Sequence, residues 1–161
     1  LFALDGPVAI RYPRGGEGVY REDRSGAPIV RLREGRDVTL LGYGVLINEL
    51  LSAAQMLAED GIQSEVLKLN QIAPLNAGIL AEYFTGTRRL LVLEDSMGAG
   101  CVGQRVTAIL AEAGLLPPQV ILKNMGRAFA PEGTVPELDH SFGLDAPAVA
   151  EAVRKAVNHG P

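Results

Sequence analysis

One short segment in the second half of this 161-residue chain holds the residues best suited to chemistry. Glu94 and Asp95 are adjacent carboxylates that directly follow an apolar run. Such a pair can serve a reaction as acid or base, or accept N–H bonds from the start of a following helix. Gly98, Gly100 and Gly103 come next and form a G-x-G-x-x-G pattern. Between a strand and a helix, that pattern is the fingerprint of dinucleotide-binding domains.

Two features argue against a dinucleotide at this glycine loop. The fingerprint belongs in the first strand–helix unit of such domains, whereas this one lies deep in the chain. The acidic residue expected about 20 residues further on is missing, because the next apolar run ends in Lys123-Asn124-Met125. We therefore favour a tight turn whose glycines allow close helix–sheet packing. For Glu94 and Asp95 we favour a structural or interface role over a catalytic one.

Two arginines near the start of the chain, Arg11 and Arg14, flank a tyrosine and a proline. Guanidinium groups bind phosphate through paired N–H donors. Along an extended strand the two side chains would not share a face, although Pro13 and the following glycines could redirect Arg14. Taken alone, this composition favours a solvated pair.

Three further residues of reactive type are predicted to be structural. His140 has an acidic neighbour and lies in an expected loop. His159 lies at the C-terminal end, and Cys101 lies near an expected helix N-terminus, where a thiol pKa can fall. For Cys101 we favour a small packing residue. No His, Asp or Glu cluster has metal-ligand spacing, so we predict no metal site.

The elements that position these residues are apolar strands that alternate with amphipathic helices. The pattern predicts strands at residues 8–12, 28–32, 38–43, 64–69, 89–93 and 120–124, and helices at 46–59, 77–84, 102–113 and 148–157. Gly61 and Gly114 are expected to end helices, and Asn76 and Asp145 to begin them. The alternation favours a mainly parallel sheet with helices on both faces. Binding sites in such sheets lie at the carboxyl ends of the strands, where the Glu94 segment falls.

Composition limits the class of protein further. Hydrophobic residues make up 47% and charged residues 21%, with a net charge of −4, which is typical of one globular domain. No basic block is present, so we expect no nucleic-acid partner. No apolar stretch approaches the roughly 20 residues of a membrane span, so we expect no membrane partner. The single cysteine excludes an internal disulfide and suits a cytoplasmic location.

Five segments, in the same order along the chain, resemble the 1-deoxy-D-xylulose-5-phosphate synthases. They are Gly6-Pro-Val-Ala-Ile-Arg-Tyr-Pro-Arg-Gly15, Leu32-Arg-Glu-Gly-Arg-Asp-Val-Thr-Leu-Leu-Gly-Tyr-Gly44, Leu69-Asn-Gln-Ile-Ala-Pro-Leu75, Leu91-Val-Leu-Glu-Asp95 with the glycine loop, and Phe142-Gly-Leu-Asp145. The most specific of them is the Arg-Tyr-Pro-Arg-Gly stretch. More loosely, the pattern is similar to transketolases and to the β chains of 2-oxoacid dehydrogenases.

This resemblance implies a three-layer α/β/α domain with a mixed, mainly parallel five-stranded sheet. Residues 1–26 would then be the end of a preceding pyrimidine-binding domain plus a linker, and residues 27–161 the C-terminal domain. Thiamine diphosphate and Mg²⁺ would bind mainly outside this chain, between the N-terminal and middle domains. No catalytic residue would lie in this chain, while Arg14 would bind the substrate phosphate.

The resemblance also implies partners: the N-terminal and middle domains of the same enzyme, and a second copy in a homodimer. The chain starts at Leu1, and its first expected strand has no earlier partner, so we expect a fragment that is inactive alone. Ala73-Pro74-Leu75-Asn76 replaces the usual Lys-Pro-Leu-Asp, which suggests a divergent or split member. Alternatives are the C-terminal domain of another transketolase or dehydrogenase relative, or a non-catalytic dimerisation module.

Overall fold

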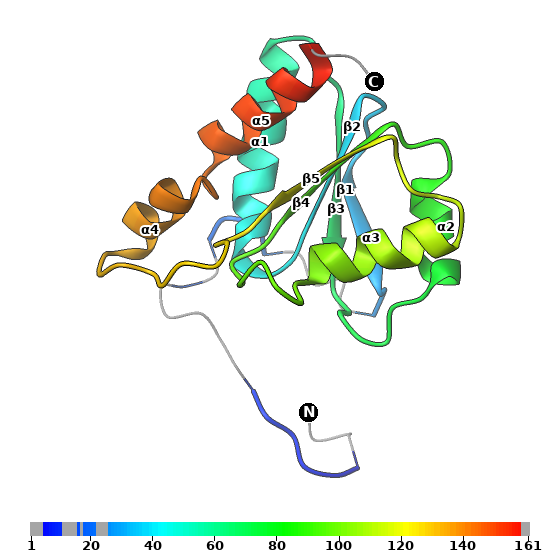
Figure 1. Ribbon diagram of the computed structural model, residues 1–161, viewed down its shortest axis with the longest axis horizontal. Helices are drawn as coiled ribbons and strands as arrows, with labels where there is room; N and C mark the ends of the chain where they lie inside the picture. The colour runs from blue at the N-terminus through cyan, green and yellow to red at the C-terminus, as the bar shows by residue number, and fades with distance from the viewer. Residues whose placement is uncertain (1–4, 11–15, 17, 22–25, 159–161) are drawn as a thin grey trace.

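The computed structural model describes residues 5–10, 16, 18–21 and 26–158. Five strands and five α-helices follow one another in this part of the chain (Figure 1): β1 Ile29–Arg33, β2 Val38–Gly42, α1 Ile47–Glu59, β3 Ser64–Leu69, α2 Ala77–Phe84, β4 Arg89–Leu93, α3 Val102–Glu112, β5 Gln119–Lys123, α4 Val135–Phe142 and α5 Ala146–Asn158. A 3₁₀ turn, η1 Gly44–Leu46, leads into α1. The order confirms the alternation of strands and helices expected from residue 28 onward.

The five strands form one mixed sheet in the order β1-β3-β2-β4-β5. β2, β3, β4 and β5 run parallel, while β1 pairs antiparallel with β3. β2 is buried along its whole length because it lies in the centre of the sheet with helices over both faces. A strand buried on both faces must be apolar throughout, which explains its sequence Val-Thr-Leu-Leu-Gly. The expected mixed, mainly parallel sheet is confirmed.

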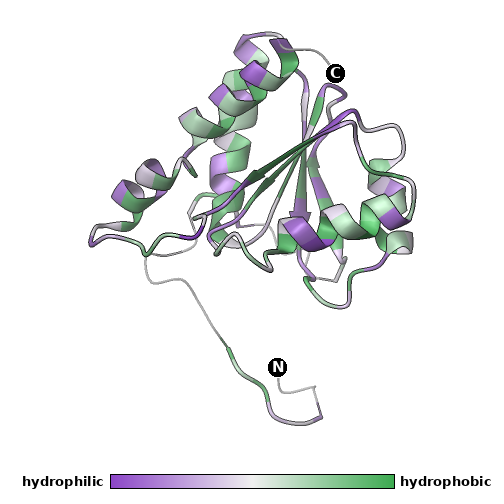
Figure 2. Cartoon of the chain, viewed as in Figure 1, coloured by the Kyte–Doolittle hydropathy of each residue, from purple (hydrophilic) through white to green (hydrophobic). Residues whose placement is uncertain are grey.

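Each face of the sheet is covered by two helices, which makes three layers (Figure 1). α1 and α5 pack on one face around Leu40, Leu50 and Val149, and α2 and α3 pack on the other around Leu41 and Val106. The strands are the most hydrophobic part of the molecule, and hydrophilic residues gather on the outer sides of the helices (Figure 2). Apolar burial of this kind supplies most of the stabilisation of such a domain.

Helix ends follow the expected capping residues closely. Asn76 accepts a hydrogen bond from the N–H of Ile79 at 3.1 Å and begins α2. Asp145 likewise accepts from the N–H of Ala148 at 3.2 Å at the start of α5, although α5 begins two residues earlier than expected. Gly61 and Gly114, just after α1 and α3, both have positive φ, which glycine adopts without strain.

Two sequence-based expectations are wrong. Residues 8–10 form no strand, and Val8 and Ile10 are exposed, because no described strand lies beside them to pair with. Residues 11–12 of that expected strand lie outside the described residues. His140 was expected in a loop, but it lies in α4, an eight-residue helix.

α4 carries standard signals at both ends. Thr134 and Glu137 form a capping box, in which each side chain bonds the backbone N–H of the other. Pro136 lies in the first turn, and Gly143 ends the helix in the left-handed conformation at φ 66°. No residue of α4 is fully buried, so its apolar positions are too few to show clear helical periodicity in the sequence.

The short segment that precedes β1 contacts helix α1 and strand β3. It lies away from β5, at the far side of the sheet order. The backbone N–H groups of Val19 and Tyr20 both donate to Asn48 at the start of α1, at 2.9 Å. The Lys68 ammonium of β3 also lies over the Tyr20 ring, 4.9 Å from the ring centre.

Among the described helices, none has the length and apolar character that a bilayer crossing needs.

Candidate functional site

The carboxyl ends of β2, β4 and β5 converge around Glu94, the first residue after β4. Glu94 is only 1% exposed, whereas the neighbouring Asp95 is exposed. The structure therefore separates the two adjacent carboxylates that the sequence presents together. One points into the domain and the other points to its surface.

Backbone N–H groups and hydroxyl groups donate four hydrogen bonds to the Glu94 carboxylate. The backbone N–H of Gly103 donates to Oε1 at 2.8 Å, and that of Val102 donates to Oε2 at 2.9 Å. The hydroxyls of Ser96 and Tyr43 also donate to Oε2, at 2.9 Å and 3.1 Å. A carboxylate has about four acceptor positions. Glu94 therefore has little capacity left for a ligand or a proton transfer.

These contacts favour the charged form of Glu94. Burial raises the pKa of this carboxyl, but hydrogen bonds from Gly103, Cys101, Ser96 and Val102 outweigh it and leave the pKa below the usual 4.5. Tyr43 shifts the other way: burial, and then the Glu94 charge, raise the pKa of its phenol far above the ordinary 10.0. Glu94 thus stays ionised and Tyr43 stays a neutral donor at physiological pH. This arrangement anchors the start of α3 to the ends of β2 and β4.

The glycine loop brings α3 close to the sheet. A Cβ on Gly103 would lie 2.9 Å from a Leu122 methyl and 3.0 Å from the Glu94 carboxylate, so only glycine fits without a shift. Gly100 has φ 73°, in the left-handed region. Gly98 donates its N–H to the carbonyl of Gly126 at 2.7 Å and so ties this loop to the one after β5.

This geometry differs from a dinucleotide site at one decisive point. In such sites the pyrophosphate binds the free N–H groups at the helix N-terminus. Here the N–H groups of Val102 and Gly103 are already bonded to the Glu94 carboxylate. The N–H of Gly100 is bonded to the side chain of Gln104 at 2.9 Å. A second anion would meet a fixed negative charge and occupied donors.

The other reactive-type residues lie apart from Glu94 or are inaccessible. Cys101 is buried and burial raises the pKa of its thiol, which disfavours the reactive thiolate form. His140 is exposed and its Nδ1 lies 2.7 Å from Asp145, across the α4–α5 turn. Among the described residues, no group of three or more His, Cys, Asp or Glu side chains could hold a metal ion. Arg11, Arg14 and His159 lie outside the described residues.

Sequence reasoning missed Tyr43 and Ser96. Tyr43 follows the central strand β2, and β2 pairs with β4 so that Gly42 is opposite Leu93. The residues immediately after two paired parallel strands are neighbours in space, so this register explains why Tyr43 meets Glu94. That register depends on the order of strands, which a single sequence does not show.

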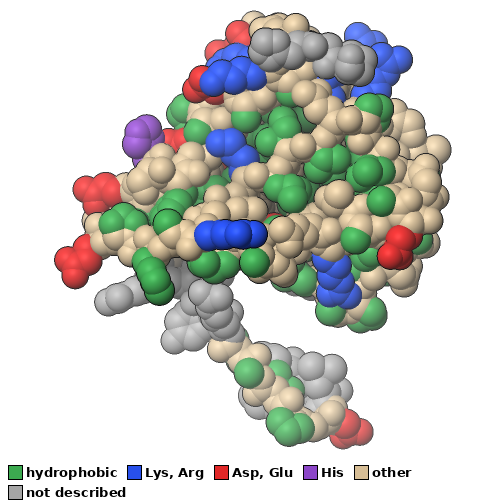
Figure 3. All heavy atoms as spheres, in the orientation of Figure 1, with side chains coloured by type: hydrophobic (Ala, Val, Ile, Leu, Met, Phe, Trp, Pro, Cys, Tyr) green, Lys and Arg blue, Asp and Glu red, His purple; other side chains and the backbone are tan. Residues whose placement is uncertain are grey.

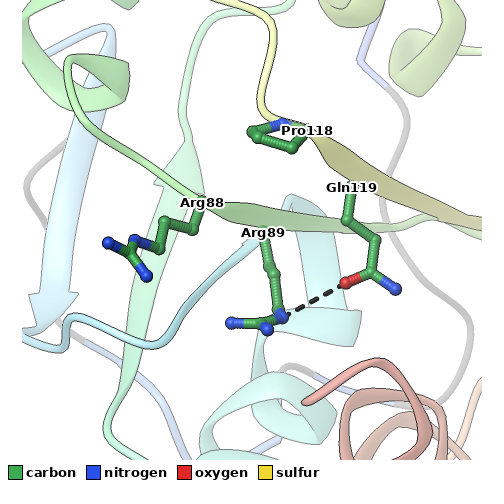
Figure 4. Close-up of a pocket in the computed structure, with 4 residues that line it drawn as sticks. All are labelled: Arg88, Arg89, Pro118 and Gln119. Atoms are coloured by element: carbon green, nitrogen blue, oxygen red, sulfur yellow. Dashed lines mark hydrogen bonds between the residues drawn. The ribbon is translucent and has the colours of Figure 1, made fainter. Parts of the chain in front are cut away.

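A shallow cavity of about 270 Å³ lies at the opposite, amino end of the sheet (Figure 4). It is lined by Arg88, Arg89, Pro118 and Gln119, and Arg89 donates to the Gln119 side chain at 3.1 Å. The lining is mostly the apolar stems of these side chains. It contains no acid–base pair or nucleophile, so it is a weaker candidate for chemistry than the Glu94 edge.

The fold and the anchored strand-to-helix loop define a known class of domain. Residues 27–149 match the family described as "Transketolase, C-terminal domain", and the chain belongs to this family. In Desulfitobacterium hafniense, a 1-deoxy-D-xylulose-5-phosphate synthase is 34% identical over 158 residues, or 94% of this chain. An enzyme of the same name in Desulforudis audaxviator is 36% identical over 145 residues, or 87% of this chain. The chain spans about a quarter of the length of these relatives, 25% and 23% respectively.

Solved structures agree with this assignment. A split-gene transketolase, described as an inactive β4 tetramer, superposes with a TM-score of 0.71 and 26% identity, over 91% of this chain and 46% of its own. A transketolase from Pichia stipitis gives a TM-score of 0.60 at 18% identity, over 83% of this chain and 18% of its own. At that identity the likeness shows the fold alone. The family and fold that the sequence motifs implied are confirmed.

Proposed function

We propose that this chain is the C-terminal domain of a 1-deoxy-D-xylulose-5-phosphate synthase, a transferase of isoprenoid biosynthesis. The complete enzyme joins pyruvate, after loss of CO₂, to glyceraldehyde 3-phosphate. The observation that carries this proposal is the 34% identity to synthases of that name over 94% of the chain. The five sequence segments quoted above support the same assignment, since they span nearly the whole chain in the family's order.

Within that enzyme, the chain serves as a rigid interdomain module without catalytic residues of its own. Glu94 is a deeply buried carboxylate at the carboxyl ends of the strands, and it accepts four hydrogen bonds that hold the fold together. Thiamine diphosphate supplies the carbanion chemistry when it is bound. We place it and its Mg²⁺ mainly outside this chain, between the N-terminal and middle domains, as the family resemblance implies. We place the enzyme in the cytoplasm.

Arg14 is the one residue of the chain that we assign to substrate. The family resemblance supports a contact between Arg14 and the phosphate of glyceraldehyde 3-phosphate. The chemistry fits, because a phosphate monoester needs charge-assisted N–H donors and arginine offers them in a rigid fork. Arg11 has a structural role in this proposal: it packs against its neighbours or supplies a positive charge at the end of its segment.

The exposed loops at the carboxyl edge, including Asp95, Gly98 and Gly100, contact the N-terminal and middle domains in this proposal. The complete enzyme is a homodimer. The assembly of the split-gene transketolase as a β4 tetramer supports self-association in this family. The same structure also supports the main alternative, in which this chain is the C-terminal part of a split transketolase.

A domain exchange tests the proposal. Residues 27–161 replace only the part of the Desulfitobacterium hafniense synthase that aligns with them, so that its own counterpart of Arg14 is kept, and formation of 1-deoxyxylulose 5-phosphate from pyruvate and glyceraldehyde 3-phosphate is measured. A control chimera carries the C-terminal domain of the Pichia stipitis transketolase, which has the same fold at 18% identity to this chain. The synthase truncated before this domain sets the background.

We expect the first chimera to form product well above the background, and the control chimera to form little. Product formation at background by a folded first chimera would contradict the proposal. If both chimeras gave equal product, any domain of this fold would support synthase activity. The experiment would then not distinguish a synthase domain from a transketolase domain, and the proposal would lose this support.

A further inference from the structure

A short stretch of the chain upstream of β1 is fastened to the domain. The amide oxygen of Asn48, the second residue of α1, accepts hydrogen bonds from the backbone N–H groups of Val19 and Tyr20, both at 2.9 Å. Asn48 is itself fixed, because its amide nitrogen donates to the carbonyl of Val45 at 2.8 Å. The upstream stretch therefore lies beside the start of α1 (Figure 1).

Side-chain contacts reinforce this attachment. Tyr20 is half-buried and packs against the core between the sheet and helices α1 and α5. The Lys68 ammonium lies 4.9 Å from the centre of the Tyr20 ring, a distance at which a cation is attracted to the ring face. Gly18 has φ 76°, and a Cβ there would lie 2.4 Å from the amide nitrogen of Asn48, so a side chain would displace that amide. Residues 18–20, Asn48 and Lys68 together form what we call the linker clasp.

The linker clasp lies at the carboxyl edge of the sheet. Asn48 follows the end of β2 by way of η1, and Lys68 is the penultimate residue of β3. Ligand sites in sheets of this kind lie at this edge. Further upstream, residues 5–10 are all exposed and project away from the domain (Figure 3). The linker clasp therefore fixes the point at which the upstream chain leaves the domain.

Chain length links the clasp to Arg14, the residue that we propose binds the substrate phosphate. Arg14 precedes Gly18 by four residues, and four residues of extended chain span at most about 14 Å. If the clasp opened, the chain would still be attached at Ala27, whose carbonyl accepts from the Asn70 side chain at 2.9 Å. From Ala27, thirteen residues reach up to about 45 Å. The clasp thus shortens the reach of Arg14 from the carboxyl edge about threefold.

We propose that Asn48 is a positioning residue for the substrate phosphate, which acts by holding the linker clasp closed and so keeps Arg14 near the carboxyl edge. This inference rests on the proposed function, in which that edge contacts the N-terminal and middle domains. Asn48 itself does not touch substrate. A ligand group that is already restrained loses less conformational freedom when substrate binds, and small errors of position are costly to rate.

Steady-state kinetics of the complete enzyme test the positioning role. Asn48→Ala removes the acceptor, and we expect it to lower kcat/KM for glyceraldehyde 3-phosphate at least about fivefold, but less than Arg14→Ala does. For an unphosphorylated aldehyde the loss should stay below about twofold. Asn48→Asp keeps an oxygen acceptor for the two N–H groups, and it should bring the phosphorylated substrate back to within about twofold of the unsubstituted enzyme.

Asp37→Ala is the matched control. The Asp37 carboxylate also accepts a backbone N–H, that of Gln63 at 2.7 Å, but it does so at the amino ends of β2 and β3, away from the clasp. This variant removes a comparable loop contact, so it should affect the two aldehydes equally. A loss in Asp37→Ala with the same preference for the phosphorylated aldehyde would mean that general destabilisation explains the effect, and it would overturn the proposal.

Hydrogen exchange of the same enzyme tests the clasp itself, without substrate. The N–H groups of Val19 and Tyr20 should exchange slowly in the unsubstituted enzyme and in Asn48→Asp, and quickly in Asn48→Ala. Fast exchange in the unsubstituted enzyme would overturn the proposal, as would an equal loss on both aldehydes in Asn48→Ala. Slow exchange in an enzyme that forms no 1-deoxyxylulose 5-phosphate would contradict the proposed function, and with it the role of Asn48 toward the phosphate, while the clasp itself would stand.

Discussion

At the scale of single residues, Glu94 holds the carboxyl edge of the sheet together. Its carboxylate joins Tyr43 after β2, Ser96 after β4 and the first N–H groups of α3. The sequence identified Glu94 and Asp95 as a pair of interest. It could not show that one side chain is buried and the other exposed, because that depends on which strands are neighbours.

The first prediction concerns the charge of Glu94. Glu94→Gln keeps the shape of the side chain, but it removes the charge and turns one acceptor into a donor that faces N–H groups. Hydrogen bonds to charged groups contribute about 1.5–3 kcal/mol, so we expect the free energy of unfolding to fall by about that amount. Urea unfolding measures it. Asp95→Asn, at the exposed neighbour, should change the same quantity by less than about 0.5 kcal/mol.

A second prediction follows from the pKa of Glu94. Hydrogen bonds, acting against burial, hold the folded-state pKa below the ordinary 4.5. The stability that the carboxylate contributes is therefore present above about pH 4.5 and is lost as the pH falls through the folded-state pKa. The difference in unfolding free energy between the native chain and Glu94→Gln should be constant near neutral pH and shrink below about pH 4.5. A difference that grows on acidification would contradict the pKa assignment.

At the scale of elements, apolar runs predicted the five strands of the sheet to within one or two residues. β1, for example, was expected at residues 28–32 and lies at Ile29–Arg33. α4 was not predicted, because a helix with no fully buried residue shows little apolar periodicity in its sequence. The capping box formed by Thr134 and Glu137 was the signal that could have indicated its start. Strand order was not predictable, since it depends on contacts between distant segments such as Gly42 and Leu93.

The packing of α3 on the sheet gives a third prediction. Gly103→Ala adds a Cβ about where Leu122 and Glu94 already lie, at 2.9 Å and 3.0 Å. Overpacking of this kind costs about 1–3 kcal/mol, which outweighs the roughly 1 kcal/mol that alanine gains over glycine in a helix. Gly78→Ala in α2 is the matched control, because its Cβ would approach only Asn76, at 3.3 Å. Thermal unfolding should rank Gly103→Ala clearly below this control; equal stabilities would mean that α3 can shift outward.

At the scale of the whole molecule, the chain spans about a quarter of the length of the relatives it matches, and Arg14, the residue that we propose binds substrate, precedes β1 in the sequence. The family was recognisable from the sequence because its motifs fall on the loops that join strands to helices. The role of Arg14 stays a proposal, because Arg14 lies outside the described residues and, in that proposal, other domains complete the substrate pocket.

Arg14 gives the fourth prediction, in the complete enzyme. Arg14→Ala should lower kcat/KM for glyceraldehyde 3-phosphate by roughly 10- to 150-fold, because a hydrogen bond to a charged group contributes about 1.5–3 kcal/mol. The loss should be much smaller for an unphosphorylated aldehyde, which makes no such contact. Arg11→Ala is the control and should affect both aldehydes equally. An equal loss on both aldehydes for Arg14→Ala would make this arginine structural.

In our proposal, this chain completes a 1-deoxy-D-xylulose-5-phosphate synthase. The most direct measurement is the product spectrum of the complete polypeptide that carries it, supplied with thiamine diphosphate, Mg²⁺, glyceraldehyde 3-phosphate and either pyruvate or a ketose phosphate donor. We predict 1-deoxyxylulose 5-phosphate and CO₂ from pyruvate, and little transfer from the ketose phosphate. Efficient two-carbon transfer from the ketose phosphate, with no product from pyruvate, would contradict the account and identify a transketolase instead.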